Sequence, residues 1–478
     1  MLRPLMIANR WVEGRGEPIV STSPADGQEV ARVSGAGPDD VDAAVAAARA
    51  ALADPAWAGL KANERARCLT RLADLVSANA EHLARVQMSD NGKTLAECRA
   101  QARSAAGTFR YYAAVCETFE SELTTQRGNS VTMTVYEPVG VVAAITPWNS
   151  PLTLEAQKLA PILAAGNAVI LKPSEVTPQV ALEYARLAIE AELPPGALNV
   201  VTGAGDVGRT LVEHPGVDMV SFTGGTAAGR AIAEACGRTL KPVVLELGGK
   251  SPNIVCADAD LDAAVTGVAS GIFSGAGQSC IAGSRVFVER PIFETFLERL
   301  TSEAEGYRLG PPDAEDTRVG PMASLAQRDR VAAYVESACS EGGTVTTGGE
   351  IPRGGIFDAG AYYPATVITG VTNHARVCQE EIFGPVVVVL PFEGEADLIE
   401  QANDSDFGLA AGIWTADYRR AWRVARALRA GTVWINTYKE LSISTPFGGF
   451  KQSGIGREKG RQGMTVYMEP KGLYWHVG

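Results

Sequence analysis

The strongest constraint on the fold is a series of short apolar segments that recur between residues 139 and 247. Each segment has the length of a β-strand, and the stretch between one and the next has the apolar spacing of a helix. Strands that alternate with helices form parallel sheets through right-handed crossovers. The sequence therefore predicts an open, doubly wound parallel sheet with a ligand crevice at the carboxyl ends of its strands. The predicted strands are Val139–Ile145, Ala168–Leu171, Leu198–Val201, Met219–Phe222 and Val243–Leu245.

A second series of alternating strands and helices follows the first, and a helical region precedes it. Residues from Asp39 to about Met88 have apolar side chains at helical spacing. In the second series we predict strands at Arg285–Val288, Val386–Leu390, Gly412–Thr415 and Thr432–Ile435, with helices near Phe293–Glu303, Ala323–Glu341 and Tyr418–Leu428. The expected fold class is α/β, with a doubly wound cofactor domain, a second α/β catalytic domain and a small β extension.

Two β-prone segments predict strands outside the main sheets. Ser130–Tyr136 alternates polar and apolar side chains, and Thr465–Met468 is rich in β-formers. A strand between two domains leaves an unpaired edge, and pairing with another subunit hides it. We therefore expect a homodimer or homotetramer, with an ordinary hairpin inside one subunit as the alternative. The expected boundaries are 1–117 and 138–247 for the cofactor domain, 248–450 for the catalytic domain, and 118–137 and 458–478 for the bridging segments.

Charge and composition argue against several classes of partner. The chain of 478 residues carries 43 Lys plus Arg against 55 Asp plus Glu, and its net charge of −12 disfavours nucleic acid and anionic membrane. No apolar stretch approaches the ~18 to 20 residues of a membrane span, and the first residues do not resemble a secretory signal. Eight cysteines without a CxxC pair and four histidines without HExxH spacing indicate free thiols, no metal site and a cytoplasmic location.

Two glycine-rich loops are candidate phosphate-binding turns. Residues 203–208 read GAGDVG, a GxGxxG pattern that includes Gly205 and follows a predicted strand. The acidic residue that this pattern expects at the end of the next strand is missing, because that strand ends in Ser221 and Phe222. Residues 222–229 form a second strand-to-helix loop whose backbone amides can face a pyrophosphate. Either loop taken alone is also compatible with simple turn punctuation.

Three short motifs are typical of a nucleotide-dependent enzyme, and two of them lie at predicted strand ends. Lys172 and Glu175 follow the second predicted strand, and Glu175 is suited to accept hydrogen bonds from both hydroxyls of an adenosine ribose. Glu246 lies at a strand end beside glycines, a position suited to a general base. Cys280 follows Gly275 and Gly277, so a substrate can approach its sulfur closely. The alternatives are a solvated, capped loop for the first motif and a buried structural thiol for Cys280.

Taken together, the motifs make the chain similar to the aldehyde dehydrogenase superfamily over nearly its whole length. Seven motifs stand in the family's order at its approximate spacing. They are ITPWN at 145–149, KPSE at 172–175, FTGG at 222–225, LELGG at 245–249, GQSC at 277–280, EEIFGP at 380–385 and PFGG at 446–449.

The resemblance implies a role for each matched residue. Cys280 is expected to be the nucleophile, Glu246 the general base, and Asn149 the amide that stabilises the oxyanion. The cofactor is expected to be NAD, with NADP as an alternative. Its expected contacts are Ile145, Thr146, Pro147, Trp148, Lys172, Ser174, Glu175, Gly205, Phe222, Thr223, Gly224, Gly225, Leu247, Glu381 and Phe383. Relatives that pass the acyl group to coenzyme A generally lack the glutamate, so its presence implies release of a free acid.

The expected substrate pocket departs from the family pattern. Ser150 and Gln157 stand where many relatives carry bulky aromatics, so the aromatic cage that a quaternary ammonium aldehyde needs is absent, which disfavours betaine aldehyde. Lys439 brings charge near the expected entrance and suggests a polar, carboxylate-bearing semialdehyde, although it also fits a surface position. Leu441 and Phe447 complete the predicted pocket. Two other classes stay open: a thiol acyltransferase or hydrolase without redox chemistry, and a non-catalytic protein on this scaffold.

Overall fold

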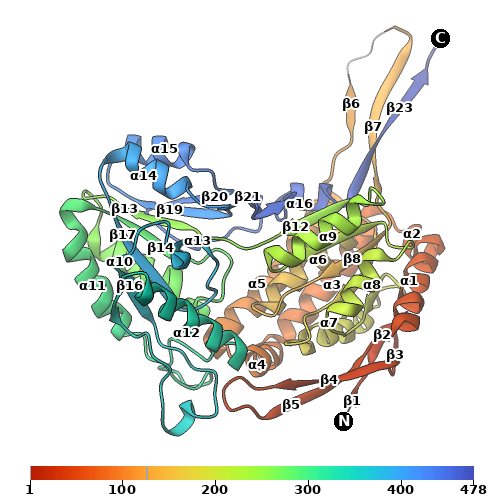
Figure 1. Ribbon diagram of the computed structural model, residues 1–478. Coiled ribbons are helices and arrows are strands. Elements are labelled where there is room, and N and C mark those ends of the chain that lie inside the picture. The colour runs from red at the N-terminus through yellow and green to blue at the C-terminus, as the bar shows by residue number, and fades with distance from the viewer. Residues whose placement is uncertain (1, 125–127) are drawn as a thin grey trace.

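The computed structural model describes residues 2–124 and 128–478, which form two α/β units and a projecting β extension (Figure 1). The first unit contains an eight-stranded sheet in the order β22-β12-β11-β8-β9-β10-β2-β3. Its five central strands are parallel, and β22, β2 and β3 add antiparallel edges. The strands are β2 Leu5–Ile7, β3 Arg10–Val12, β8 Val141–Ile145, β9 Ala168–Lys172, β10 Leu198–Val200, β11 Met219–Thr223, β12 Val243–Glu246 and β22 Gly454–Ile455.

Helices cover both faces of this sheet because its central strands are apolar on both sides. Val142 and Ala144 of β8 pack into one hydrophobic cluster, whereas Val141, Ala143 and Ile145 pack into the opposite one. The helices are α1 Pro38–Ala53, α2 Pro55–Ala58, α3 Ala62–Ala78, α4 Ala80–Asn91, α5 Leu95–Glu117, α6 Pro151–Ala164, α7 Gln179–Glu190, α8 Gly205–Glu213 and α9 Thr226–Gly237. The strand order reverses direction between β8 and β11, which places the ligand crevice at their carboxyl ends.

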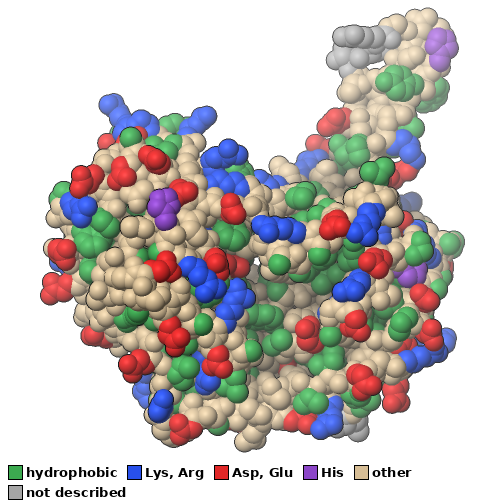
Figure 2. All heavy atoms as spheres, in the orientation of Figure 1, with side chains coloured by type: hydrophobic (Ala, Val, Ile, Leu, Met, Phe, Trp, Pro, Cys, Tyr) green, Lys and Arg blue, Asp and Glu red, His purple; other side chains and the backbone are tan. Residues whose placement is uncertain are grey.

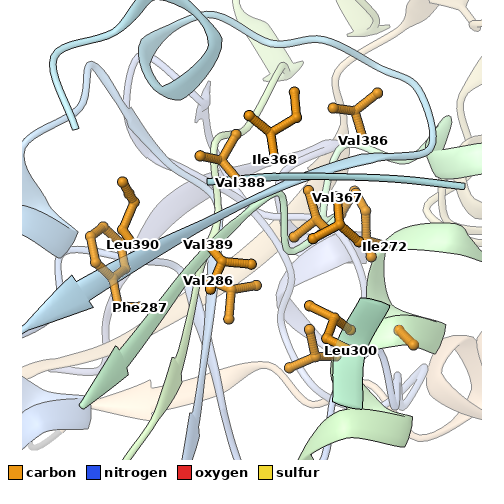
Figure 3. Packing of buried hydrophobic residues seen from close by; sticks show 14 of the residues in the cluster. Ile272, Val286, Phe287, Leu300, Val367, Ile368, Val386, Val388, Val389 and Leu390 are labelled. Atoms are coloured by element: carbon orange, nitrogen blue, oxygen red, sulfur yellow. The ribbon is translucent and has the colours of Figure 1, made fainter. Parts of the chain in front are cut away.

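The second unit contains a seven-stranded sheet in the order β15-β16-β17-β14-β13-β19-β20, parallel except for β15. Val286 and Val389 lie on the face of the sheet that bears Ile272 and Leu300, and Val388 lies on the opposite face with Ile368 (Figure 3). The strands are β13 Pro252–Val255, β14 Arg285–Glu289, β15 Thr344–Thr347, β16 Thr366–Thr369, β17 Val386–Phe392, β19 Ala410–Trp414 and β20 Thr432–Ile435. The helices are α10 Leu261–Phe273, α11 Phe293–Glu305, α12 Leu325–Ser340, α13 Arg376–Gln379, α14 Gly394–Asn403 and α15 Tyr418–Ala427. The predicted α/β fold class is confirmed.

Three strands form the extension that projects from the body in Figure 1: β6 Glu122–Thr124, β7 Ser130–Pro138 and β23 Met468–His476. The predicted strand at Thr465–Met468 is wrong, because the short helix α16 occupies Gln462–Thr465 and the strand begins only at Met468. The expectation of an unpaired edge on the 130–136 strand is also wrong. β7 lies in the middle, paired with both β23 and β6, so the free edges belong to those two strands.

Two smaller sheets complete the fold, and the sequence analysis did not predict them. One contains β1 Leu2–Arg3, β4 Gly16–Thr22 and β5 Glu29–Gly35, and the other pairs β18 Phe407–Gly408 with β21 Phe450–Lys451. Of the expected boundary segments, Met1 and residues 125–127 lie outside the described residues, and the boundaries stay predictions. Within residues 2–124 and 128–478, no helix is long and apolar enough to cross a membrane.

A buried carboxyl group in the helical layer makes stability depend on pH. Glu155 of α6 is fully buried, and neither of its oxygens has a hydrogen-bond partner among the described residues. Burial, together with the charge of Asp90, raises its pKa well above the ordinary value. The folded state therefore binds this proton more tightly than the unfolded chain does. The stabilisation that comes from the protonated Glu155 is fully present below the ordinary glutamate pKa. It is lost as the pH rises through the pKa that Glu155 has in the folded protein.

We expect Glu155→Gln to stabilise the protein relative to the natural chain as the pH rises from 5 to 8, by about 1–3 kcal/mol, because it removes the charge that burial penalises. Thermal or urea unfolding across this pH range measures the difference. Glu117→Gln, at the exposed end of α5, is the matched control and should keep the natural pH dependence. A Glu155→Gln variant that follows the natural curve would show that Glu155 does not titrate in this range.

Candidate active site

A cavity of about 580 Å³ lies between the two α/β units and is also lined by α5 and α6. The surface is visibly hollowed in this region in Figure 2. Cys280, Glu246 and Asn149 all line the cavity, although they come from distant parts of the chain. The structure thus brings together the three residues that the sequence singled out for chemistry.

A tight left-handed turn presents Cys280 to the cavity. After α10 ends at Phe273, the backbone φ angle is +67° at Gly275, +52° at Ala276 and +66° at Gly277. A Cβ on Gly277 would lie 1.9 Å from the carbonyl oxygen of Gly384, so only glycine fits there. This close packing explains why small residues precede the cysteine, and it fixes the position of the sulfur.

Burial keeps the Cys280 sulfur protonated at rest. Its pKa is raised to about 12, first by burial and then by the charges of Glu381 and Glu246, while Lys439 and Lys459 act in the opposite direction. Because the thiolate is the nucleophile, the group must lose its proton to a base before it attacks, and a nearby positive charge stabilises the thiolate that forms.

Asn149 is positioned beside the turn that carries Cys280. Its side-chain amide nitrogen donates to the carbonyl oxygen of Gln278 at 3.0 Å. The backbone carbonyls of Trp148 and Asn149 both accept from the Asn91 side chain at 3.3 Å, which anchors the loop after β8. The Asn149 amide is therefore held within one turn of the nucleophile, where it can donate to an oxygen on the attacked carbon.

Glu246 ends β12 and is almost fully buried, and neither of its oxygens has a hydrogen-bond partner among the described residues. Its pKa is raised well above the ordinary value, by burial first and by the charge of Glu458 second, against the opposing charges of Lys158, Arg457 and Lys459. A carboxylate with a raised pKa is a stronger base, so Glu246 is suited to take a proton near neutral pH.

An ion pair behind Glu246 was missed by the sequence analysis. The Nζ of Lys158 lies 2.6 Å from Glu458 Oε1 and also donates to Ser221 Oγ at 3.0 Å. Gln157 donates to the other Glu458 oxygen at 2.5 Å, so this predicted pocket residue is also part of the network. The available signal was a lysine directly before the apolar run that ends α6, but its partner lies 300 residues away.

Part of the predicted cofactor set lines the same cavity. The Phe383 ring meets the Trp148 ring edge to face at 5.2 Å, and Glu381 Oε1 accepts from the backbone nitrogen of Gly249 at 3.1 Å. Burial raises the Glu381 pKa to about 7. The predicted residues on the cavity wall are Pro147, Trp148, Thr223, Gly224, Gly225, Leu247, Glu381 and Phe383.

The other predicted cofactor residues lie around neighbouring strand ends. Lys172 Nζ is 3.9 Å from Glu175 Oε2 and donates to the Pro173 carbonyl at 2.9 Å. A Cβ on Gly208 of α8 would lie 3.6 Å from the Lys172 side chain, so this loop packs beside the start of α8. Ile145 and Phe222 lie in the strands and Thr146 just after one, while Ser174 belongs to the Lys172 loop and Gly205 begins α8.

All five predicted substrate-pocket residues line the cavity: Ser150, Gln157, Lys439, Leu441 and Phe447. The sequence analysis missed two further lysines on the same wall. Lys93 follows α4, and Lys459 lies 5.1 Å from the centre of the Phe447 ring.

Residues 11–473 match the sequence model of the aldehyde dehydrogenase family. The chain belongs to this family. The resemblance seen in the seven motifs is thereby confirmed, and the protein is an oxidoreductase that converts an aldehyde to a carboxylic acid. Membership favours this dehydrogenase activity over both alternatives, a thiol acyltransferase and a non-catalytic protein.

Relatives of this aldehyde dehydrogenase match it over essentially its full length. It is 43% identical over 474 residues to a betaine aldehyde dehydrogenase of Brucella anthropi, covering 99% of this chain and 97% of that one. It is 42% identical to a betaine aldehyde dehydrogenase of Mesorhizobium japonicum, covering 100% of this chain and 99% of that one. The NAD+ complex of an aldehyde dehydrogenase from Bacillus cereus has a TM-score of 0.98 at 40% identity, covering 100% and 97% of the two chains.

The dehydrogenase also has groups that suit a dinucleotide. The hydroxyls of Thr146, Thr223 and Thr226 are buried without a hydrogen-bond partner among the described residues. Gly225 precedes the twelve-residue helix α9, where no side chain caps the free backbone amides. Unpaired hydroxyls and amides at a strand-to-helix turn are the groups that bind a diphosphate.

Proposed function

We propose that this enzyme oxidises a small polar aldehyde to the free acid with NAD+, using Cys280, Glu246 and Asn149. The observation that carries the proposal is the convergence of these three side chains on one cavity whose other wall bears the predicted cofactor residues. The solved relative with bound NAD+ supports the choice of cofactor.

In the proposed first step, the Cys280 thiol releases its proton to water, the thiolate sulfur adds to the aldehyde carbon, and the carbonyl oxygen becomes an alkoxide. The Asn149 amide and the Cys280 backbone N–H donate to this oxygen, and losing one such donor typically costs about 3 kcal/mol in the transition state. Phe383 and the other predicted contacts on the cavity wall would hold the nicotinamide, which would supply an acceptor for the hydride of the adduct, and Cys280 would then keep the acyl group as a thioester. Glu246 then takes a proton from water, the water oxygen adds to the thioester carbon, and the carbon–sulfur bond breaks to release the acid.

The proposed preference for NAD+ over NADP+ rests on Glu175. Its carboxylate is half exposed at the end of β9 and lies close to Lys172, a placement suited to accept hydrogen bonds from both ribose hydroxyls. The same charge repels a phosphate on the 2′ oxygen. We expect kcat/KM to favour NAD+ over NADP+, and Glu175→Gln to reduce the preference about tenfold. A preference for NADP+ in the natural enzyme would contradict this assignment.

We propose that the substrate is a polar aldehyde without a quaternary ammonium group. The relatives, in contrast, are named for betaine aldehyde, which carries such a group. Ser150 and Gln157 occupy the wall where an aromatic cage would be needed, and Gln157 is already bonded to Glu458. The cationic side chains on the cavity wall, which are those of three lysines and Arg330, outnumber the carboxyl groups of Glu97, Glu246 and Glu381 by one, and this balance disfavours a fixed cation. Polar semialdehydes fit this lining better than betaine aldehyde does.

The proposed function is tested by following NADH formation with a panel of aliphatic, aromatic, semialdehyde and quaternary ammonium aldehydes. We expect NADH and the free acid in equal amounts, with no dependence on coenzyme A. Enzyme that forms no NADH with any member of the panel, or forms acyl-coenzyme A in place of the acid, would contradict the proposal.

We also propose that the extension joins subunits into a homo-oligomer in the cytoplasm. The free edges of β6 and β23 carry exposed apolar side chains, among them Leu123, Tyr474 and Trp475. All eight cysteines are free, which suits a reducing compartment. Sedimentation or light scattering of the full chain measures the number of subunits, and a monomer would contradict the first part.

A further inference from the structure

Two lysines without a carboxylate partner among the described residues line the substrate cavity. Lys93 and Lys439 both line it, and the charge of Lys93 lowers the pKa of Lys439, which burial and this neighbour together bring to about 8. Among the described residues, the lysines that lie within 4.0 Å of a carboxylate are Lys158, Lys172 and Lys471. Two like charges held together without a partner on a cavity wall indicate a place for an anion.

The nearby acidic side chain, Glu97, does not fill this role. One of its oxygens accepts from the backbone nitrogen of Gly275 at 2.7 Å. The other accepts from the backbone nitrogen and hydroxyl of Thr94, at 3.2 and 3.0 Å. Glu97 therefore offsets one positive charge from a distance while its oxygens serve the Cys280 turn and the start of α5. The other carboxyl groups on the cavity wall are Glu246 and Glu381, and burial raises the pKa of both, which favours their uncharged forms. Glu97 alone therefore leaves one positive charge of the two lysines without a balancing charge.

The turn that carries Lys439 is rigidly attached to the Cys280 loop. The Tyr438 hydroxyl donates to the carbonyl oxygen of Ile281 at 3.1 Å, one residue beyond the nucleophile. On the other side, the Glu440 carbonyl accepts from the Trp434 indole at 2.7 Å. Lys439 itself has a φ angle of +60°, a strained conformation for a residue other than glycine, which these two anchors maintain. The backbone that carries Lys439 is thus held at a fixed place relative to Cys280.

Lys93 is fixed to the same loop from the opposite side. Its Nζ would lie only 2.5 Å from a Cβ placed on Gly275, so its ammonium rests against the turn before Cys280. The adjoining wall is polar: Gln101 of α5 donates to the hydroxyl of Ser150 at 3.2 Å, and Ser104 and Thr153 complete it. These groups offer hydrogen bonds to a substrate whose far end is charged.

We propose that Lys439, with Lys93 beside it, binds a carboxylate at the end of the substrate remote from the aldehyde, so that the preferred substrates are ω-carboxylate semialdehydes. This inference rests on the proposed function, because it assumes that the aldehyde carbon lies at Cys280. Lys439 is a specificity-determining residue here: it holds the far end of the chain and takes no part in the bond changes.

The test compares each of 4-oxobutanoate, 5-oxopentanoate and 6-oxohexanoate with its own methyl ester. The ester has the same chain and aldehyde but no charge. We expect the natural enzyme to prefer at least one acid over its ester by about 10- to 100-fold in kcat/KM, the range of a charge-assisted hydrogen bond. Lys439→Met should lose most of this ratio through a higher KM for the acid, and Lys439→Arg should keep most of it. Lys61→Met, on an exposed lysine before α3, should keep the natural ratio.

A second measurement does not need turnover. Glutarate carries a carboxylate at both ends, whereas pentanoate carries one, and both should protect Cys280 from alkylation by iodoacetamide. Lys439→Met should raise the glutarate concentration needed for half-protection about tenfold or more and change the pentanoate concentration little. Acids and esters used equally well by the natural enzyme, or a natural acid-to-ester ratio in Lys439→Met, would overturn the inference while leaving the chemistry at Cys280 intact. If the natural enzyme oxidises no aldehyde at all, the proposed function fails instead.

Discussion

Cys280→Ala is expected to reduce NADH formation by at least about 10⁴-fold in kcat, the scale on which loss of a nucleophile acts. Without the sulfur, no tetrahedral adduct forms, and the aldehyde carbon has no added electron density with which to release its hydrogen as hydride. The Asn149 amide and the cofactor wall remain in place, but they stabilise an oxyanion that is no longer made. Stopped-flow and steady-state absorbance of NADH measure both the first turnover and the sustained rate.

The control uses another free thiol of the same chain. Cys339 is exposed and lies outside the cavity wall, so Cys339→Ala should keep the natural rate. Quenching of tryptophan fluorescence by NAD+ should show that Cys280→Ala still binds the cofactor. An alanine variant that binds NAD+ and continues to form acid at a substantial rate would place the nucleophile elsewhere and remove the basis of the proposed mechanism.

The sequence predicted the central sheets because their physical signal is local. A strand such as Ala168–Lys172 is buried on both faces and is read directly as a continuous apolar run. Pro252–Val255 begins with a proline, which argues against a strand, and Thr366–Thr369 contains only two apolar residues, so both strands were missed. At Thr465, local β-propensity was overridden because Met464 and Tyr467 are buried against the helical layer, which a helical turn permits.

The site was predicted in its reactive side chains and missed in its surroundings. The glycines around Cys280 and Glu246 adjoin the reactive residues in the sequence, because close packing beside these residues leaves no room for a larger side chain. The ion pair between Lys158 and Glu458 joins segments that are hundreds of residues apart in the sequence. Lys93 and Lys439 reach the same cavity from segments equally far apart. Neither arrangement leaves a local pattern in the sequence. Those long-range contacts contribute to the pKa values and the charge of the pocket, so the structure adds Lys93 to the substrate argument that the sequence based on Lys439 alone.

Glu246→Gln is expected to separate the two halves of the reaction. The first turnover should still form NADH as a burst, because the steps that lead to the thioester need Cys280 and Asn149. The steady-state rate should fall by about 10²- to 10⁴-fold, since glutamine cannot take a proton from water. Rapid quenching followed by mass spectrometry of the intact protein should find the acyl group on Cys280. Glu400→Gln, on an exposed face of α14, is the matched control and should show neither change.

The pH dependence of this pair distinguishes a base from a merely structural carboxyl. Burial and the charge of Glu458 raise the pKa of Glu246, so the fraction able to accept a proton grows as the pH rises through that value. The natural steady-state rate should therefore increase with pH, and Glu246→Gln should lose this limb while keeping its burst. If the variant has an unchanged steady-state rate, or a lowered rate that retains the limb, another group deprotonates the water, and the buried Glu458 would be the next residue to replace.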